Sequence, residues 1–192
     1  CLNGHSITAA GDFDVIALTQ TLTLSDCSEP DKQGKITHVK GKTGSGINTG
    51  DDSRYMTKLI MYGGNITGNT AENGAGIYCG TRVGVTLNGG SITNNIATEN
   101  GGGIYCEGDM NLNGGNITGN SAKLGGGLYT AKGSQADSKY DFVRLMGVNI
   151  SENTATEKGG GIYATYCVAL RGYENYIDDP YGIPKCSATV LN

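Results

Sequence analysis

A glycine- and asparagine-rich pattern recurs four times between residues 61 and 163. Each copy has an Ile-Thr/Ser-x-Asn segment, followed by Gly-Gly/Ala-Gly-Ile/Leu-Tyr. The copies run over 61–78, 87–105, 112–129 and 145–163, and they start 26, 25 and 33 residues apart. The longer last interval fits a loop over Lys132 to Tyr140. A period in this range predicts a solenoid whose units bury their apolar faces against their neighbours.

Residue type indicates strands inside each repeat. Asparagine, glycine and threonine are poor helix formers, and the apolar residues alternate, as in Val85-Thr86-Leu87. Three short strands per turn, separated by Gly/Asn corners, fit a coil of about 25 residues with neighbouring coils roughly 4.8 Å apart. We therefore predict an all-β fold, a single-stranded right-handed parallel β-helix of about seven coils.

Stacking of such coils predicts ladders of like residues. Two aliphatic ladders should point inward: Ile66, Ile92, Ile117 and Ile150, and Ile77, Ile104, Leu128 and Ile162. Asparagine amides should form a ladder in which each side chain bonds to the next, as in cross-β arrays, at Asn69, Asn95, Asn120 and Asn153. An outward stripe should form from Tyr78, Tyr105, Tyr129 and Tyr163. This stripe either stabilises neighbouring coils or binds a flat ligand such as a sugar ring.

The whole chain, 1–192, is interpreted as one β-helix domain. Regular repeats occupy 59–166, degenerate coils occupy 1–58, and an irregular terminal coil occupies 167–192. The hydrophobic share of 37% and the 33 glycines suit coils that each bury few aliphatic side chains. The net charge of −4 argues against a nucleic-acid partner. No apolar run approaches membrane-spanning length.

The six cysteines favour an oxidising, exported location. Cys79 and Cys106 occupy the same position in neighbouring coils, within disulfide range. Cys1 and Cys27 lie one coil apart, and Cys167 and Cys186 could close a terminal loop. Six cysteines allow 15 connectivities, so this pairing is a prediction. Free buried thiols are the alternative at Cys79 and Cys106.

No catalytic residue, metal ligand or cofactor site emerges from the sequence. The best acidic pairs are Asp51-Asp52 with Arg54, Asp178-Asp179, and Asp12 with Asp14. All lie in loop-like stretches, where we expect solvated side chains. His5 and His38 have no metal-ligand spacing with cysteines, and we expect exposed or loop positions for both.

The paired Gly-Gly-x-Ile and Ile-x-x-Asn elements, over roughly Met61 to Tyr163, resemble the repeats of chlamydial polymorphic outer-membrane proteins and similar secreted bacterial β-helix proteins. Those repeats carry Gly-Gly-Ala-Ile with Phe-x-x-Asn, and isoleucine takes the phenylalanine position here. The resemblance implies an autotransporter-type passenger with a role in adhesion or surface display.

These observations predict a non-enzymatic, extracellular or cell-surface structural or adhesive β-helix. The chain begins and ends at similar phases of the coil, at Cys1-Leu2-Asn3-Gly4 and Thr189-Val190-Leu191-Asn192. Two explanations fit this match: the chain is a fragment of a longer solenoid, or subunits self-associate end to end into filaments. Other expected partners are a polysaccharide or a host or cell-surface ligand. The alternative function is a carbohydrate-binding or polysaccharide-degrading β-helix. An enzyme of this kind should have three or more carboxylates, or a carboxylate-arginine group, converging on one face.

Overall fold

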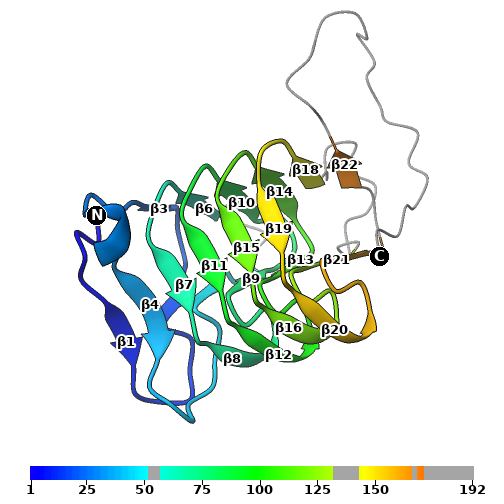
Figure 1. The fold of residues 1–192 in the computed structure, drawn as a ribbon, viewed down its shortest axis with the longest axis horizontal. Helices are drawn as coiled ribbons and strands as arrows, with labels where there is room; N and C mark the ends of the chain where they lie inside the picture. Colours follow the sequence, from blue (N-terminus) through cyan, green and yellow to red (C-terminus); the bar gives the residue numbers. More distant parts are fainter. Residues whose placement is uncertain (52–56, 132–142, 166–167, 171–192) are drawn as a thin grey trace, which may run out of the picture.

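The computed structural model describes residues 1–51, 57–131, 143–165 and 168–170. In these ranges the chain winds into six stacked coils whose parallel strands form four sheets (Figure 1). The coils advance from left to right in Figure 1, while the front strands run downward into the lower sheet and the chain returns behind them. This winding is right-handed, and the predicted right-handed parallel β-helix is confirmed.

Each strand pairs in parallel with its equivalents in the neighbouring coils. Sheet A contains β1 (Ile7–Ala9), β4 (Lys35–His38), β7 (Asn65–Thr67), β11 (Ser91–Thr93), β15 (Asn116–Thr118) and β19 (Asn149–Ser151). Sheet B contains β2 (Ile16–Ala17), β5 (Ile47–Asn48), β9 (Ile77–Cys79), β13 (Ile104–Cys106), β17 (Leu128–Thr130) and β21 (Ile162–Ala164). Sheet C contains β3 (Leu22–Leu24), β6 (Lys58–Met61), β10 (Gly84–Leu87), β14 (Asp109–Leu112), β18 (Val143–Leu145) and β22 (Val168–Leu170). Sheet D contains β8 (Thr70–Asn73), β12 (Ile96–Asn100), β16 (Ser121–Leu124) and β20 (Thr154–Lys158).

The core is a column of aliphatic side chains inside the coils. Ile92 is in register with Ile66 and Ile117, and all three are fully buried. The ladder through Ile77 and Ile104 is buried in the same way. Because equivalent residues stack directly, each coil depends on its neighbours to exclude water from its apolar side chains.

Sheet D corrects the expectation of three strands per turn. Its strands are polar, as in Thr-Ala-Glu-Asn of β8, and alanines such as Ala71, Ala97 and Ala122 supply their apolar packing. These alanines form a small second cluster with Ala75. Short strands with no large aliphatic residue at the repeated inward position lack the pattern that identifies a strand in a sequence.

A tight corner between sheets A and D requires a left-handed backbone. The φ angles are +67° at Gly68, +53° at Asn94, +66° at Gly119 and +58° at Glu152. Glycine adopts this conformation without strain, and asparagine tolerates it better than most residues. The variable residue of the Ile-Thr/Ser-x-Asn segment must therefore adopt a left-handed conformation. Glu152 is the one residue with a long side chain among these four.

Candidate functional site

The predicted asparagine positions form a continuous hydrogen-bonded column inside the helix. The side-chain nitrogens of the first three asparagines each donate to the side-chain oxygen of the asparagine in the next coil, at 2.9 to 3.0 Å. All four side-chain nitrogens donate to the main-chain oxygen of an isoleucine in the preceding coil. The first three members are fully buried, and both side-chain amide hydrogens of each have an acceptor. The residues are Asn69, Asn95, Asn120 and Asn153.

His38 continues this column into the preceding coil, where the sequence predicts an exposed or loop residue. Its side chain is only 6% exposed. Nδ1 lies 2.8 Å from Oδ1 of Asn69, and Nε2 lies 2.8 Å from the main-chain oxygen of Phe13. The correction has a simple cause: a ring with two nitrogens can reach both the ladder and the loop outside it. His5 is exposed, as expected.

The tyrosine stripe is a stack of rings on the outer face of sheet B. The ring centroids of Tyr78 and Tyr105 are 5.2 Å apart with planes 7° from parallel, and those of Tyr105 and Tyr129 are 5.2 Å apart at 4°. The last pair, Tyr129 and Tyr163, is tilted by 31° at 5.6 Å. The middle rings therefore cover one another's faces, and only a terminal ring has a face without a tyrosine neighbour.

Burial and nearby acids raise the pKa of the first two phenols of the stripe. Burial first, and then the charges of Asp51 and Glu107, raise the pKa of Tyr78 to about 12. Burial and a hydrogen bond to Glu107 also raise the pKa of Tyr105. Tyr78 and Tyr105 thus present neutral hydroxyl groups at neutral pH.

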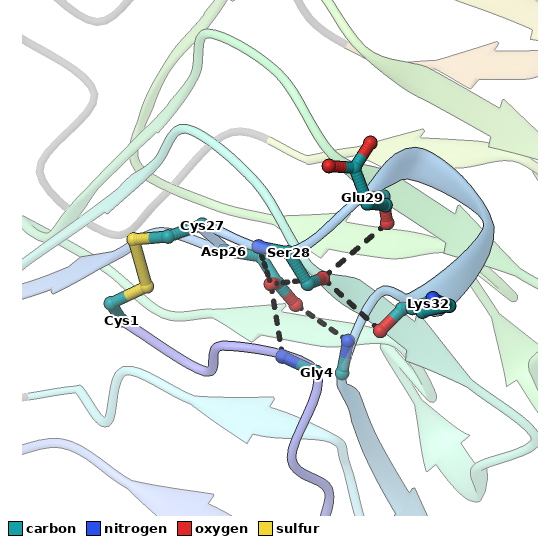
Figure 2. Close-up of a disulfide and its surroundings, with 8 residues drawn as sticks. Cys1, Gly4, Asp26, Cys27, Ser28, Glu29 and Lys32 are labelled. Carbon is teal, nitrogen blue, oxygen red and sulfur yellow. Dashed lines mark hydrogen bonds between the residues drawn. A yellow bond between two sulfur atoms is a disulfide. The ribbon is translucent and has the colours of Figure 1, made fainter.

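The structure joins Cys1 to Cys27, with Cα atoms 6.2 Å apart (Figure 2). Cys79 and Cys106 are in register in adjacent coils, as expected, but are buried free thiols here. A hydrogen bond with Cys79, together with burial, raises the pKa of the Cys106 thiol. A bond between Cys79 and Cys106 stays a prediction. The pair Cys167 and Cys186 lies outside the described residues.

Beside the disulfide, Asp26 organises the first turn of the chain (Figure 2). Its carboxylate accepts hydrogen bonds from the main-chain nitrogens of Gly4, Ser28 and Gly34 and from the Ser28 hydroxyl. Burial alone would raise the pKa of Asp26, but these hydrogen bonds outweigh it and lower the pKa to about 2. A short 3-10 helix, η1 (Pro30–Lys32), follows this turn.

Of the three acidic pairs, only Asp12 and Asp14 are described completely, and both line one groove. Asp12 forms an ion pair with Lys42 at 3.0 Å. Asp14 accepts from the main-chain nitrogen of Ser45 at 2.7 Å and from Nδ2 of Asn48 at 2.8 Å. Asp14 is therefore a fixed, partly buried group, in contrast to the solvated loop residue that the sequence predicts.

This groove, which we call the N-terminal groove, has a volume of about 460 Å³. Its lining includes Asp12, Phe13, Asp14, Asn48, Glu72 and Tyr78. Sequence reasoning missed the groove because these residues come from three successive coils. A usable signal was the break in the repeat, since the first two coils lack both the tyrosine and the ladder asparagine.

The remaining expected sites lie partly or wholly beyond the described ranges. Asp51 is exposed, whereas Asp52, Arg54, Asp178 and Asp179 are outside these ranges. Among the described residues, no cluster of three His, Cys, Asp or Glu side chains could hold a metal ion. In the same part of the chain, no helix has the length and apolar character needed to cross a membrane.

Two segments match the family model of the Chlamydia polymorphic membrane protein repeat, at residues 88–107 and 147–165. Each segment contains one sheet A, one sheet D and one sheet B strand in succession, β11 to β13 and β19 to β21. The resemblance of the repeats is thus established at these two coils. Neither the curated proteins nor the solved structures include a match to the chain.

Proposed function

We propose that this chain is a non-enzymatic structural or adhesive β-helix displayed at a cell surface. The observation that carries the proposal is the unbroken asparagine column through four coils. Buried amides that bond only to neighbouring coils couple those coils into a stiff rod, because no coil can shift without leaving polar groups unpaired. The stacked tyrosines add further contacts between the same neighbouring coils, on the outer face.

The repeat match supports a surface location. The model that matches two coils describes a repeat of chlamydial polymorphic membrane proteins. Repeats of that kind suit a rod that projects from a membrane and presents the same side chains at regular intervals. On this basis the expected ligand is a polysaccharide or a host-cell surface component.

The test is attachment of the intact protein to surfaces. Beads coated with the protein should adhere to epithelial cells or to immobilised polysaccharides, and soluble protein should compete. Beads coated with the same protein after thermal unfolding provide the control. Equal attachment of both bead types, or no attachment, would contradict the adhesive role. Cleavage of a polysaccharide substrate would contradict the non-enzymatic one.

End-to-end assembly is a second proposal, supported by the edge strands at one end of the rod. Among the described residues, β1, β2 and β3 are the outermost strands of sheets A, B and C. A strand edge that no strand of the same chain covers is a template for another chain. Electron microscopy of the oxidised protein should show filaments whose axial repeat equals one rod, while isolated rods at high concentration would refute assembly.

A further inference from the structure

The N-terminal groove exists because sheet D begins only in the third coil. In the first two coils the chain between sheets A and B forms loops, over 10–15 and 39–46, where later coils have a strand. The two loops are tied together, since Asp12 accepts from Lys42 and from the main-chain nitrogen of Thr43, each at 3.0 Å. The second loop is tied to β8 by the 2.7 Å bond from Gly44 N to Thr70 O. The walls are therefore held before any ligand arrives.

Two aromatic side chains line this groove. Tyr78 is the first ring of the stack, and the residue in register with it in the preceding coil is Asn48, so no tyrosine covers that side of its ring. Phe13 is 63% exposed. Exposure of a large apolar side chain to water is unfavourable and often marks a binding surface. The main chain of Phe13 is held in place by the hydrogen bond between its carbonyl oxygen and the buried His38 ring. Aromatic rings of this kind pack against the C–H faces of sugars.

The polar lining suits hydroxyl groups. Both oxygens of Asp14 are held by protein donors, yet each retains acceptor capacity. Glu72 and Asn73 from β8 line the same groove. A volume of about 460 Å³ is within the range of small-molecule sites.

Charge selects among sugars. The carboxylates of Asp12, Asp14 and Glu72 line the groove, and Lys42 is paired to the first of them. Uronic or sialic acids would meet like charges, whereas neutral and amino sugars would not.

We propose that the N-terminal groove binds a short, non-acidic oligosaccharide between Phe13 and Tyr78, with Asp14 accepting from its hydroxyl groups. The inference deepens the proposed adhesive function, because it names the ligand class and the part of the rod that binds it. In this proposal the first ring of the tyrosine stack, Tyr78, contacts the ligand, and the other rings stabilise the packing of neighbouring coils.

Isothermal titration calorimetry of the intact protein tests this with cellotetraose, mannotetraose, chitotetraose and trigalacturonate. At least one of the three non-acidic sugars should bind, and trigalacturonate should not. Phe13→Ala should weaken binding about tenfold, the size of one good aromatic contact. The matched control is Tyr62→Ala, since Tyr62 is 59% exposed and follows β6, away from the groove. It should change affinity less than twofold.

Circular dichroism of each variant verifies the β-helix. Absence of binding by all three non-acidic sugars would overturn the groove proposal, and so would equal weakening by Tyr62→Ala. Either result leaves bead attachment untouched, so the adhesive function can fail or stand separately. Release of new reducing ends from a bound sugar would support the groove as a sugar site while refuting the non-enzymatic function.

Discussion

The coils from β6 to β21 differ from the first two coils in how their ladders are occupied. In the later coils, asparagine follows asparagine inside and tyrosine follows tyrosine outside. In the second coil, the His38 side chain takes the place of an asparagine in bonding to Asn69, and Asn48 stands at the tyrosine position. The first two coils also lack sheet D, contain the disulfide and the Asp26 turn, and form the groove together with the third coil.

The difference shows where a solenoid can carry specific chemistry. In a regular stack, each polar group is satisfied by its copy in the next coil, so one residue type must be kept throughout. At the end of the series, a different residue must form the hydrogen bond that the missing copy would form, as His38 does with the side-chain oxygen of Asn69. Those replacements need not be identical, and they can shape a binding surface.

The largest effect is expected from breaking the regular stack at Asn95. Asn95→Ala leaves the main-chain and side-chain nitrogens of Asn69 without their shared acceptor and the Ile66 carbonyl without its donor. We expect the free energy of unfolding to fall by about 3–5 kcal/mol, measured by chemical denaturation. Asn113→Ala is the control, because Asn113 bonds to Asn88 at the exposed surface and should cost under about 0.5 kcal/mol. Similar losses for both variants would contradict a special role for the buried column.

Removal of the disulfide addresses the first coil alone. Cys27→Ser should lower stability by about 3 kcal/mol, because Cys1 and Cys27 close a loop spanning 26 residues. Melting temperatures with and without reductant measure the effect. The variant itself should no longer respond to reductant if neither the pair Cys79 and Cys106 nor the pair Cys167 and Cys186 is bonded. A further fall would reveal a second disulfide.

His38 tests the junction between the two regions. His38→Ala removes bonds to Asn69 and to Phe13, and we expect a loss of about 2 kcal/mol. His38→Asn can keep a ladder bond while losing the reach to Phe13, so its loss should be about half as large. Equal stability of the two variants would show that the ladder bond contributes nothing at this end.

Acid should act on the first coil through Asp26. Its pKa falls from an ordinary 3.8 to about 2 in the folded chain, so its contribution is complete above pH 3.8 and is lost as the pH falls toward 2. Asp26→Asn should be less stable than the parent at pH 5, with a shallower decline in melting temperature between pH 4 and 2. Parallel declines would show that Asp26 does not dominate this range.

Alkali should act on the regular stack through the tyrosines, with the smallest effect of the series. The pKa of Tyr78 rises from 10.0 to about 12 on folding, so its contribution is present below pH 10 and is lost as the pH rises to 12. Tyr78→Phe should reduce the decline in stability over this interval. The difference in phenolate absorbance between the parent and Tyr78→Phe isolates this one phenol and should appear only as the pH approaches 12. Its appearance near pH 10 in the folded protein would contradict the shift.

The sequence by itself determined the winding, the length of the coil and the ladders. Residues such as Ile92 and Asn95 recur at one period, and a β-helix places like residues of successive coils in register. Residues that occupy equivalent positions in successive repeats are therefore expected to contact one another, which is why the aliphatic core can be predicted from the sequence alone. The repeat match at 88–107 and 147–165 is confined to segments of this kind.

Only the tertiary structure decided the parts of the chain where the period fails. Sheet D escaped prediction because alanine provides its apolar packing, and His38 because a single histidine gives no sign of the coil position that it fills. Asp14, Asn48 and Glu72 meet in one groove although they come from three coils and share no motif. Such a meeting depends on loop lengths and on the register between unlike coils, which residue type and spacing alone do not encode.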